Sequence, residues 1–314
     1  MLEAPEQNEG CLLGVLAGDR IGALCEGLTP AVVAARHGAA EDLIEARPGT
    51  YGSSTEMTAA VAEGLVAAPE FDGADMARRL SEGAQRGRGY GQATWTAIER
   101  LRRGVDWQEA GAGGGGRSSY GNGAATRSAP VGLLFGADVD VLRWTAEEIA
   151  AITHQHSLGA EGAAMQAFAV AIAAGSHGRQ ISPAGFLISV GREASLREYR
   201  VRYEEAARMT EREPDARRVI DKLGNGETAL GSVVTAAYCF ARFSDDLPAA
   251  VAAAASLGGN ARSLASMTGA LCGAHLGSRA VPERWLDGPD DVRAMVTRLR
   301  AAASGLGQAA RRLE

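Results

Sequence analysis

Three acidic side chains lie within or beside apolar and hydroxyl-rich segments, where a carboxyl group could take part in proton transfer. Asp19 and Glu26 lie within and just after the apolar, glycine-spaced segment 14–27, and Glu56 follows a run of hydroxyl residues. A carboxyl group can act as a general acid or base. For Glu26, at the exit of the expected helix, a functional role and a structural role both stay open. For Asp19, a buried structural role is the main alternative.

Segment 52–58 places three hydroxyl side chains, Ser53, Ser54 and Thr55, at the expected start of a helix, directly before Glu56. Serine and threonine are preferred helix N-caps, and the helix dipole favours a carboxylate in the first turn. Helix capping alone therefore explains the residue types of this segment.

A second polar segment, 258–263, reads G-G-N-A-R-S and brings Asn260, Arg262 and Ser263 to the start of another expected helix. A guanidinium in the first turn of a helix opposes the helix dipole. We therefore expect a nearby acid or an anionic ligand to compensate the charge of Arg262.

Segment 118–130, S-S-Y-G-N-G-A-A-T-R-S-A-P, contains a Gly-Asn-Gly turn that runs into an expected helix. Such a turn exposes backbone N–H groups that suit a phosphate or a carboxylate, although a glycine-rich turn alone is a weak signal. His154 and His156, two residues apart, could share a metal ion, but one histidine of such a pair is more often a surface residue. We predict no metal ligand.

The composition argues against several classes of protein. The chain has 314 residues, is 46% hydrophobic and carries a net charge of −6, which argues against a general nucleic-acid binder. All its basic residues except Lys222 are arginine, a bias typical of high-GC bacterial genomes. Segment 1–9 lacks the features of a signal peptide, and no stretch reaches the roughly 18 apolar residues of a membrane helix. We predict a cytoplasmic protein without membrane or nucleic-acid partners.

The hydrophobic pattern is that of helices. Met57, Val61 and Leu65 recur on one helical stripe, and segments 161–174, 228–243 and 263–276 show similar spacing. Segment 293–314 is expected to form a terminal amphipathic helix, and segment 186–190 is too short to assign. The glycines that recur every four residues would let another helix approach closely; they are Gly14, Gly18 and Gly22.

Glycine and proline mark the loops, and no linker divides the chain, so we predict one domain over residues 1–314. The run 111–116 is a glycine-rich loop of undetermined role. The cysteines form no CxxC pair, and we expect buried, reduced thiols. They are Cys11, Cys25, Cys239 and Cys272.

Four segments, in the same order along nearly the whole chain, resemble the ADP-ribosylglycohydrolase family, which includes the ADP-ribosylarginine hydrolases and the dinitrogenase reductase-activating glycohydrolase. The first is G-C-L-L-G-V-L-A-G-D-R-I-G-A-L-C-E-G, and the second is S-Y-G-N-G-A-A-T-R-S-A-P. The third is I-T-H-Q-H-S-L-G-A-E-G-A, and the last is L-G-G-N-A-R-S-L-A-S-M-T-G-A-L-C-G-A-H-L-G followed by V-P-E-R-W-L. The resemblance implies a compact, orthogonal, all-α multi-helix bundle whose cleft holds ADP-ribose over two magnesium ions.

The metal motifs of that family are replaced in this chain. The family usually has Thr-Asp-Asp where Gly52, Ser53 and Ser54 stand, and Asp-Thr-Asp-Ser/Thr where segment 260–263 reads N-A-R-S. Magnesium in proteins normally takes carboxylate oxygens, and the positive charge of Arg262 would repel it. We therefore expect no binuclear magnesium site and no cofactor.

The resemblance also implies that substrate contacts are kept, and it places Glu26 near the scissile bond. The candidate substrate-binding residues are Ser53, Ser54, Ser119, Tyr120, Gly121, Asn122, Gly123, His154, Asn260 and Ser263. The candidate catalytic residues are Glu26, Asp19, Glu56 and Arg262.

These features favour a rebuilt enzyme, because the changes fall on the metal ligands while the shaping glycines persist. We predict a metal-independent hydrolase of N-ribosyl bonds that acts on an ADP-ribose-like or nucleotide-derived small molecule in a bacterial biosynthetic pathway. The main alternative is an inactive ADP-ribose- or nucleotide-binding pseudoenzyme that regulates a protein partner, which the sequence does not identify. Lyase or isomerase chemistry on the same frame is a third hypothesis.

Overall fold

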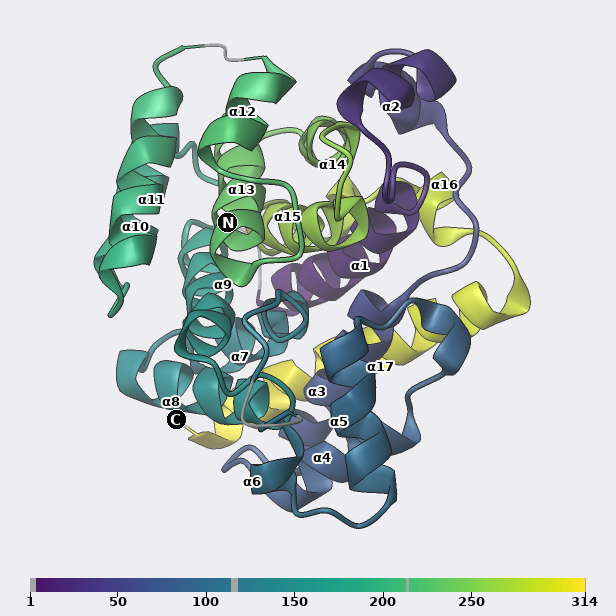
Figure 1. Cartoon of the computed structure of the whole chain (residues 1–314), viewed down its shortest axis with the longest axis vertical. Coiled ribbons are helices and arrows are strands. Elements are labelled where there is room, and N and C mark those ends of the chain that lie inside the picture. Colours follow the sequence, from purple (N-terminus) through teal and green to yellow (C-terminus); the bar gives the residue numbers. More distant parts are fainter. Residues whose placement is uncertain (1–3, 114–117, 213–214, 314) are drawn as a thin grey trace.

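The computed structural model describes residues 4–113, 118–212 and 215–313, and within these ranges it contains helices and no β-strand. The all-helical prediction is therefore confirmed. Figure 1 shows that the helices cross one another rather than lying in one parallel bundle, with α1 (Ala4–Gly22) and α15 (Ala261–Leu276) side by side in the interior. The resemblance implied this orthogonal arrangement.

The remaining elements follow in chain order. The α-helices are α2 (Pro30–His37), α3 (Ser53–Ala67), α4 (Gly73–Glu82), α5 (Gln92–Arg102), α6 (Trp107–Ala110), α7 (Ala129–Phe135), α8 (Val139–Ala151), α9 (Ser157–Gly175), α10 (Pro183–Arg192), α11 (Arg197–Met209), α12 (Ala216–Lys222), α13 (Ala229–Arg242), α14 (Leu247–Ser256), α16 (Glu283–Leu286) and α17 (Asp290–Leu313). The short 3-10 helices are η1 (Ala40–Glu45), η2 (Arg86–Arg88), η4 (Ala125–Arg127) and η5 (Ser278–Ala280).

Helices α1 and α15 approach one another closely at the glycines of α1. A Cβ atom built on Gly14 would lie 2.0 Å from the carbonyl oxygen of Gly269, and one on Gly22 would lie 2.4 Å from that of Ala261. Gly18 makes the same approach to Ala265, so the predicted role of the four-residue glycine spacing is confirmed. Because the helices are antiparallel, this contact sets the end of α1 beside the start of α15.

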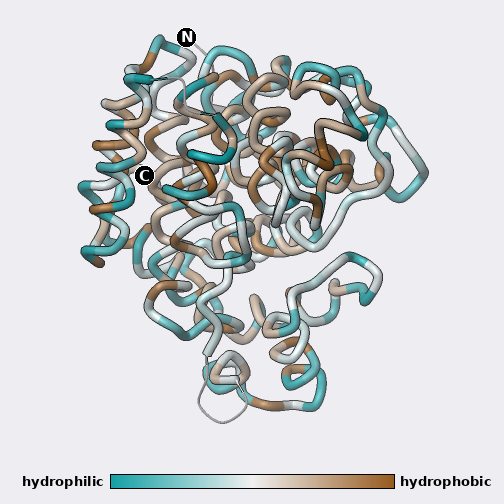
Figure 2. The backbone as a smooth tube through the Cα atoms, turned by 45° about the horizontal axis from the view of Figure 1, so that its top comes forward, coloured by the Kyte–Doolittle hydropathy of each residue, from teal (hydrophilic) through white to brown (hydrophobic). Residues whose placement is uncertain are grey.

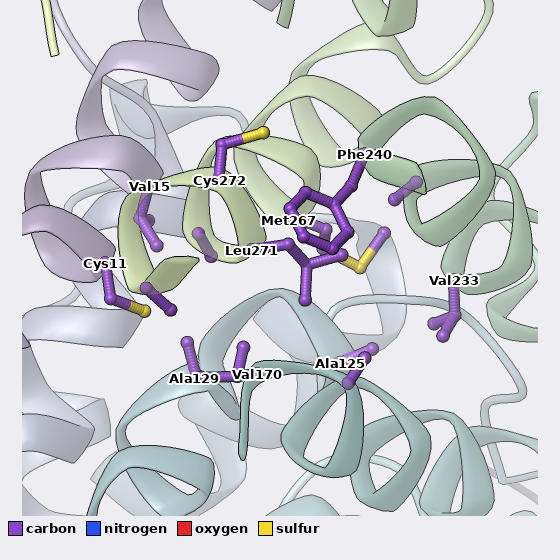
Figure 3. Packing of buried hydrophobic residues seen from close by; sticks show 14 of the residues in the cluster. Cys11, Val15, Ala125, Ala129, Val170, Val233, Phe240, Met267, Leu271 and Cys272 are labelled. Atoms are coloured by element: carbon purple, nitrogen blue, oxygen red, sulfur yellow. The ribbon is translucent and has the colours of Figure 1, made fainter. Parts of the chain in front are cut away.

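The core surrounds this helix pair. Val15 of α1 and Leu271 of α15 pack near Phe240 of α13 and Val170 of α9, all of them buried (Figure 3). Figure 2 shows the same layout along the backbone, with apolar helices inside and hydrophilic stretches toward the outer loops. The predicted stripe of Met57, Val61 and Leu65 on α3 is also buried.

Segment 186–190, which is too short to assign from the sequence, lies inside α10. Helix α9 is long and apolar enough to cross a membrane, which the sequence reading missed, but 67% of the apolar window is buried inside the protein. All four cysteines are free and buried, as predicted. The predicted terminal helix is α17, and part of the glycine run 111–116 lies outside the described residues.

Candidate functional site

A pocket of about 370 Å³ lies where the end of α1, the start of α3, the loop before α5, the turn before η4 and the start of α15 meet. The glycine contact between α1 and α15 supplies one wall by placing residue 26 beside residues 260–263.

The Gly258–Gly259 turn joins three loops at this wall. Both glycines have left-handed φ angles, +65° and +61°, which suit glycine. The N–H of Gly27 donates to the carbonyl of Gly259 at 2.8 Å, and the N–H of Gly259 donates to Leu28 at 2.9 Å. The N–H of Asn260 donates to the carbonyl of Asn225 at 2.7 Å. The turn therefore fixes the backbone around Glu26 and Asn260 together.

Glu26 lies on the pocket wall and is exposed, with its carboxylate held in one orientation. Asn260 Nδ2 donates to Oε1 at 3.0 Å, and the backbone N–H of Arg262 donates to Oε2 at 2.8 Å. Desolvation by the pocket walls raises the pKa of Glu26, while these two hydrogen bonds and the charge of Arg262 lower it in part. The geometry leaves a carboxylate available to accept a proton within the pocket.

Asp19 is buried behind the pocket and is fully engaged by the surrounding chain. Its Oδ2 accepts the N–H of Gly52 at 2.8 Å, the N–H of Thr55 at 3.2 Å and the hydroxyl of Thr55 at 2.7 Å. Its Oδ1 accepts Arg262 Nη1 at 3.1 Å. Asp19 is thus the acid that compensates Arg262, and it holds the start of α3.

This contact corrects the interpretation of segment 52–58. Gly52 is the N-cap of α3, and none of the hydroxyls Ser53, Ser54 and Thr55 caps the helix. The reason is that Asp19, on α1, already accepts the N–H of Thr55, which a cap would otherwise satisfy, and it also accepts the N–H of Gly52.

Gly52 leaves room for the guanidinium of Arg262. A Cβ atom on Gly52 would lie 2.4 Å from Arg262 Nη1, 2.9 Å from Asp19 Oδ1 and 3.1 Å from the carbonyl oxygen of Arg88. Cβ atoms in proteins essentially never come within 3.0 Å of a non-bonded heavy atom of another part of the chain. Any larger residue at position 52 would therefore displace the Arg262–Asp19 ion pair. The glycine and the arginine therefore fit one another.

Glu56 is buried and faces away from the pocket lining. Its Oε2 accepts the backbone N–H of Gln85 at 2.9 Å and the hydroxyl of Tyr90 at 2.5 Å, and its Oε1 lies 3.9 Å from Arg88 Nε. These contacts anchor the loop between α4 and α5, which supplies Tyr90 to the pocket.

The Gly-Asn-Gly turn forms the opposite wall. The N–H of Asn122 donates to the carbonyl of Glu227 at 2.9 Å, and the N–H of Gly121 donates to Ser119 Oγ at 3.1 Å. Asn122 Nδ2 donates to Asn260 Oδ1 at 2.7 Å, which links this wall to the one that carries Glu26.

His154 is buried and neutral at the pocket wall. Burial, and next the nearby charge of Arg127, lower the pKa of His154 to about 3. Arg127 Nη2 donates to Thr153 Oγ1 at 2.7 Å, and this hydroxyl lies 2.6 Å from His154 Nδ1. A hydroxyl that accepts from Arg127 is free to donate to Nδ1, which leaves the proton of the neutral ring on Nε2, beside Gly121 and Gly123.

The structure gathers most of the predicted site residues and separates a few. Those that line the pocket are Glu26, Ser53, Ser54, Ser119, Gly121, Asn122, Gly123, His154, Asn260 and Ser263. Asp19, Glu56 and Arg262 lie outside the lining, as does Tyr120, which is 53% exposed and packs edge-on against His156.

Sequence reasoning missed part of the lining. The unpredicted residues are Met57, Gly89, Tyr90, Gly91, Gln92, Ala93, Thr94, Thr126 and Glu227. The glycine-aromatic run at 89–91 was a usable signal for a loop near a ligand, and Glu227 follows the Gly224-Asn225-Gly226 turn.

The oxygen donors at this site do not match a pair of magnesium ions. Hard dications favour carboxylate oxygens, but segments 53–54 and 260–263 offer only hydroxyl, amide and backbone oxygens. The carboxylate of Asp19 is held by Arg262. Among the described residues, no group of three or more His, Cys, Asp or Glu side chains could hold a metal ion.

Comparison with known proteins places this pocket in a family. Residues 5–312 match the family described as ADP-ribosylglycohydrolase. The chain is 33% identical to human ADP-ribosylhydrolase ARH3, over 88% of this chain and 87% of that protein, and 32% identical to the mouse protein, over 88% and 85%. An uncharacterized protein of Archaeoglobus fulgidus is 30% identical, over 91% of this chain and 92% of its own length.

A solved structure shares the fold. The structure titled "ADP-ribosylglycohydrolase-related protein complex" superposes with a TM-score of 0.71 and is 26% identical, covering 96% of this chain and 98% of its own. The family match extends over nearly the whole chain and includes every wall of the pocket. The chain therefore belongs to the ADP-ribosylglycohydrolase family.

Proposed function

We propose that this protein hydrolyses an N-ribosyl bond in an ADP-ribose-like or nucleotide-derived small molecule, without a metal ion. The observation that carries the proposal is the pairing of Arg262 with Asp19 beside an accessible Glu26. A positive charge belonging to the protein occupies the place between α3 and α15 where the family motifs carry carboxylates. The ADP-ribosylhydrolase relatives support the choice of a hydrolase.

In the proposed reaction the bond between ribose C1′ and the base nitrogen breaks, and its electron pair leaves with the nitrogen. Positive charge develops on the ribose in an oxocarbenium-like transition state, which the carboxylate of Glu26 stabilises. A water oxygen bonds to C1′, and Glu26 accepts the proton that the water loses. A pyridinium-like base needs no proton to leave, because the electron pair neutralises its charge.

The neighbouring residues position the sugar and the carboxylate. Ser54, Ser263 and Asn260 line the pocket with hydroxyl and amide groups that can bind ribose hydroxyls. The Nε2–H of His154 can donate a hydrogen bond to a ligand oxygen, and it stays uncharged while doing so.

Arg262 acts as a positioning residue in this proposal. Its guanidinium holds Asp19, and its backbone N–H holds Glu26, so one residue ties both acids to the start of α15. The arginine-rich composition supports a bacterial source, and we propose that the reaction takes place in the cytoplasm and serves a biosynthetic pathway. A pseudoenzyme that only binds a nucleotide is the other outcome of the test.

The test is turnover, followed by mass spectrometry, of NAD, nicotinamide mononucleotide, ADP-ribosyl-arginine and ADP-ribose conjugates in excess EDTA. We expect release of a base from at least one N-riboside at a rate that added magnesium does not change. Turnover only with magnesium would refute metal independence. Tight binding of these compounds without turnover, with or without magnesium, would favour the pseudoenzyme.

A further inference from the structure

The start of α3 offers backbone donors that no group of the described chain accepts. The first N–H groups of a helix have no partner within that helix. Asp19 accepts the N–H of Thr55, but the N–H groups of Ser53 and Ser54 donate to no acceptor among the described residues. Both serines line the pocket. Because α3 has 15 residues, its N-terminus also carries the positive end of a helix dipole.

The start of α15 repeats this arrangement at the same pocket. Glu26 accepts the N–H of Arg262, but the N–H of Ser263 donates to no acceptor in the part of the chain that the structure describes. Helix α15 has 16 residues, and Ser263 lines the pocket. The two helix starts are tied together, because Asp19 binds Thr55 in one and Arg262 in the other. The pocket therefore receives the positive ends of two helix dipoles.

Two buried hydroxyl groups at these helix starts open into the pocket. Ser54 is 5% exposed and Ser263 is 8% exposed, and neither Oγ makes a hydrogen bond with the described residues. Neither atom is among the unpartnered side-chain oxygens that are sealed from solvent, such as Thr145 Oγ1 and Ser266 Oγ. The remaining exposure of the two serine oxygens therefore faces the pocket that both residues line. Buried donors without a partner indicate a polar ligand.

The charge at these helix starts suits an oxyanion that carries a proton. The guanidinium of Arg262 and the carboxylate of Asp19 form an ion pair and together add little net charge. The opposing group is the carboxylate of Glu26, and donors from Asn260 and Arg262 already hold both of its oxygens. A hydrogen phosphate ion can donate its O–H to that carboxylate, which replaces a repulsion by a charge-assisted hydrogen bond.

We propose that the starts of α3 and α15 form a binding site for a phosphate-type oxyanion, with the N–H and hydroxyl groups of Ser54 and Ser263 as its main donors. Helix N-termini with free N–H groups are anion-binding sites in many proteins. A serine hydroxyl donates one hydrogen bond and accepts others, so each serine can hold the anion and still accept from a ribose hydroxyl. The role of the anion in the reaction rests on the proposed hydrolase function, whereas its binding does not.

The anion can come from two sources, and each gives a different product. Free hydrogen phosphate would take the place of water: one of its oxygens bonds to ribose C1′, the bond from C1′ to the base nitrogen breaks, and the electron pair leaves with the nitrogen. The phosphate keeps its proton, a pyridinium-like base leaves neutral, and the sugar becomes ribose 1-phosphate. Where the phosphate belongs to the substrate, water attacks C1′ and the product is a phosphorylated ribose.

Binding is measured first, on the whole protein without substrate. Titration calorimetry with phosphate near pH 7 should show one site, and Ser54→Ala and Ser263→Ala should each weaken binding by roughly tenfold. Both variants should keep the melting temperature of the wild type in phosphate-free buffer, since the hydroxyls have no protein partner in the described chain. Ser304→Ala removes a hydroxyl from an exposed position of α17 and should leave binding unchanged.

Sulfate tests the contact with Glu26. It has the shape of phosphate but no proton to donate near pH 7, so it should bind roughly tenfold more weakly. In Glu26→Gln the two anions should bind about equally, because the repelling carboxylate is gone. Absence of phosphate binding, or equal phosphate affinity in the wild type and both serine variants, would overturn the site. Sulfate binding as tight as that of phosphate in the wild type would overturn the place of the anion beside Glu26.

Reaction products then distinguish the two sources. Nicotinamide riboside and nicotinamide mononucleotide are incubated in EDTA, with and without phosphate at equal ionic strength, and the products are identified by mass spectrometry. Ribose 1-phosphate formed from the riboside would identify free phosphate as the ligand. Competitive inhibition by phosphate of mononucleotide cleavage, but not of riboside cleavage, would identify a phosphate of the substrate. Rates and products that phosphate leaves unchanged, or equal inhibition with both compounds, would overturn the role of the site in the reaction.

Failure of the oxyanion site and failure of the proposed hydrolase are distinguishable. Turnover of an N-riboside by a protein that binds no phosphate would refute the site and leave the hydrolase in place. Phosphate binding that depends on Ser54 and Ser263, without turnover of any N-riboside, would support the site and refute the hydrolase.

Discussion

Asp19 lies in helix α1, Glu26 follows seven residues later in the turn after that helix, and both contact Arg262, yet their roles differ. Asp19 is buried, and every contact it makes fastens one part of the chain to another: the start of α3 on one side and the guanidinium of Arg262 on the other. Glu26 is exposed on the pocket wall and meets Arg262 only through a backbone N–H. A carboxylate whose oxygens are already shared among protein donors stabilises the fold, whereas one that keeps free lone pairs can act on a ligand.

The difference lies in how each acid reaches the second helix. At residue 19 the glycines of α1 bring the backbones of α1 and α15 together, so no water reaches the carboxylate. At residue 26 helix α1 has ended, and the Gly258–Gly259 turn holds the loop at the rim of the pocket. The site thus places the structural ion pair of Asp19 and Arg262 directly behind Glu26, the candidate catalytic carboxylate.

The sharpest test of this division is Glu26→Gln. The change keeps the size of the side chain but removes the proton acceptor, so kcat on the cleaved N-riboside should fall by about 10² to 10⁴-fold. The melting temperature should barely move, since the residue is exposed. Parallel measurements of kcat and of thermal unfolding check the expected loss of activity and the unchanged stability. Full activity in this variant would remove Glu26 from the mechanism.

Asp19→Ala should show the opposite pattern. Removing the buried carboxylate leaves the guanidinium of Arg262 and the N–H groups of Gly52 and Thr55 without their partner, at a cost of about 3–5 kcal/mol in the free energy of unfolding. Urea unfolding measures this loss. Asp138→Ala is a matched control, because Asp138 caps α8 at an exposed position and should cost about 1 kcal/mol. Equal losses of unfolding free energy in Asp19→Ala and Asp138→Ala would mean that the burial of Asp19 and its contacts adds no stability beyond that of an exposed helix cap.

Gly52→Ala probes the fit between the glycine and Arg262. The added Cβ would lie 2.4 Å from Nη1, so the ion pair must shift, and we expect a loss of about 1–3 kcal/mol in the free energy of unfolding. In an Arg262→Ala background the same change should cost at least about 1 kcal/mol less, as a double-mutant cycle would show. Gly49→Ala is the control, since a Cβ there meets nothing within 4 Å.

Much of this site could be predicted from the sequence because its residues sit at the ends of strongly patterned helices. The glycine spacing of α1 predicted a close helix neighbour, and the position of Arg262 in a first helical turn predicted a compensating acid. Neither feature could name the partner, because the pairing of α1 with α15 joins residues more than 240 positions apart.

Side-chain direction was the part that the sequence could not supply. Glu56 follows the hydroxyls of segment 53–55, yet it faces Tyr90 and Gln85, because the packing of the loop before α5 decides where it points. Glu227 drew no attention, since a single exposed acid after a glycine turn is usually solvated; only the contact of its carbonyl with Asn122 brings it to the pocket.

The smallest expected effect concerns the pH at which Glu26 becomes active. Hydrogen bonds from Asn260 Nδ2 and the Arg262 N–H favour the ionised carboxylate and offset part of the rise in the Glu26 pKa that desolvation causes. Asn260→Ala removes one of these bonds, so the pKa of Glu26 should rise further.

Catalysis requires the ionised form, so kcat/KM rises with pH through this pKa, and the acidic limb of the profile should move to higher pH in Asn260→Ala. His154 adds no limb above pH 5, because its lowered pKa of about 3 keeps it neutral there. Profiles of kcat/KM from pH 4 to 8 measure the shift in Asn260→Ala against the wild type. An acidic limb at the same pH in both proteins would assign the titrating group to another residue, and Glu26 would then lose its catalytic role while Asp19 kept its structural one.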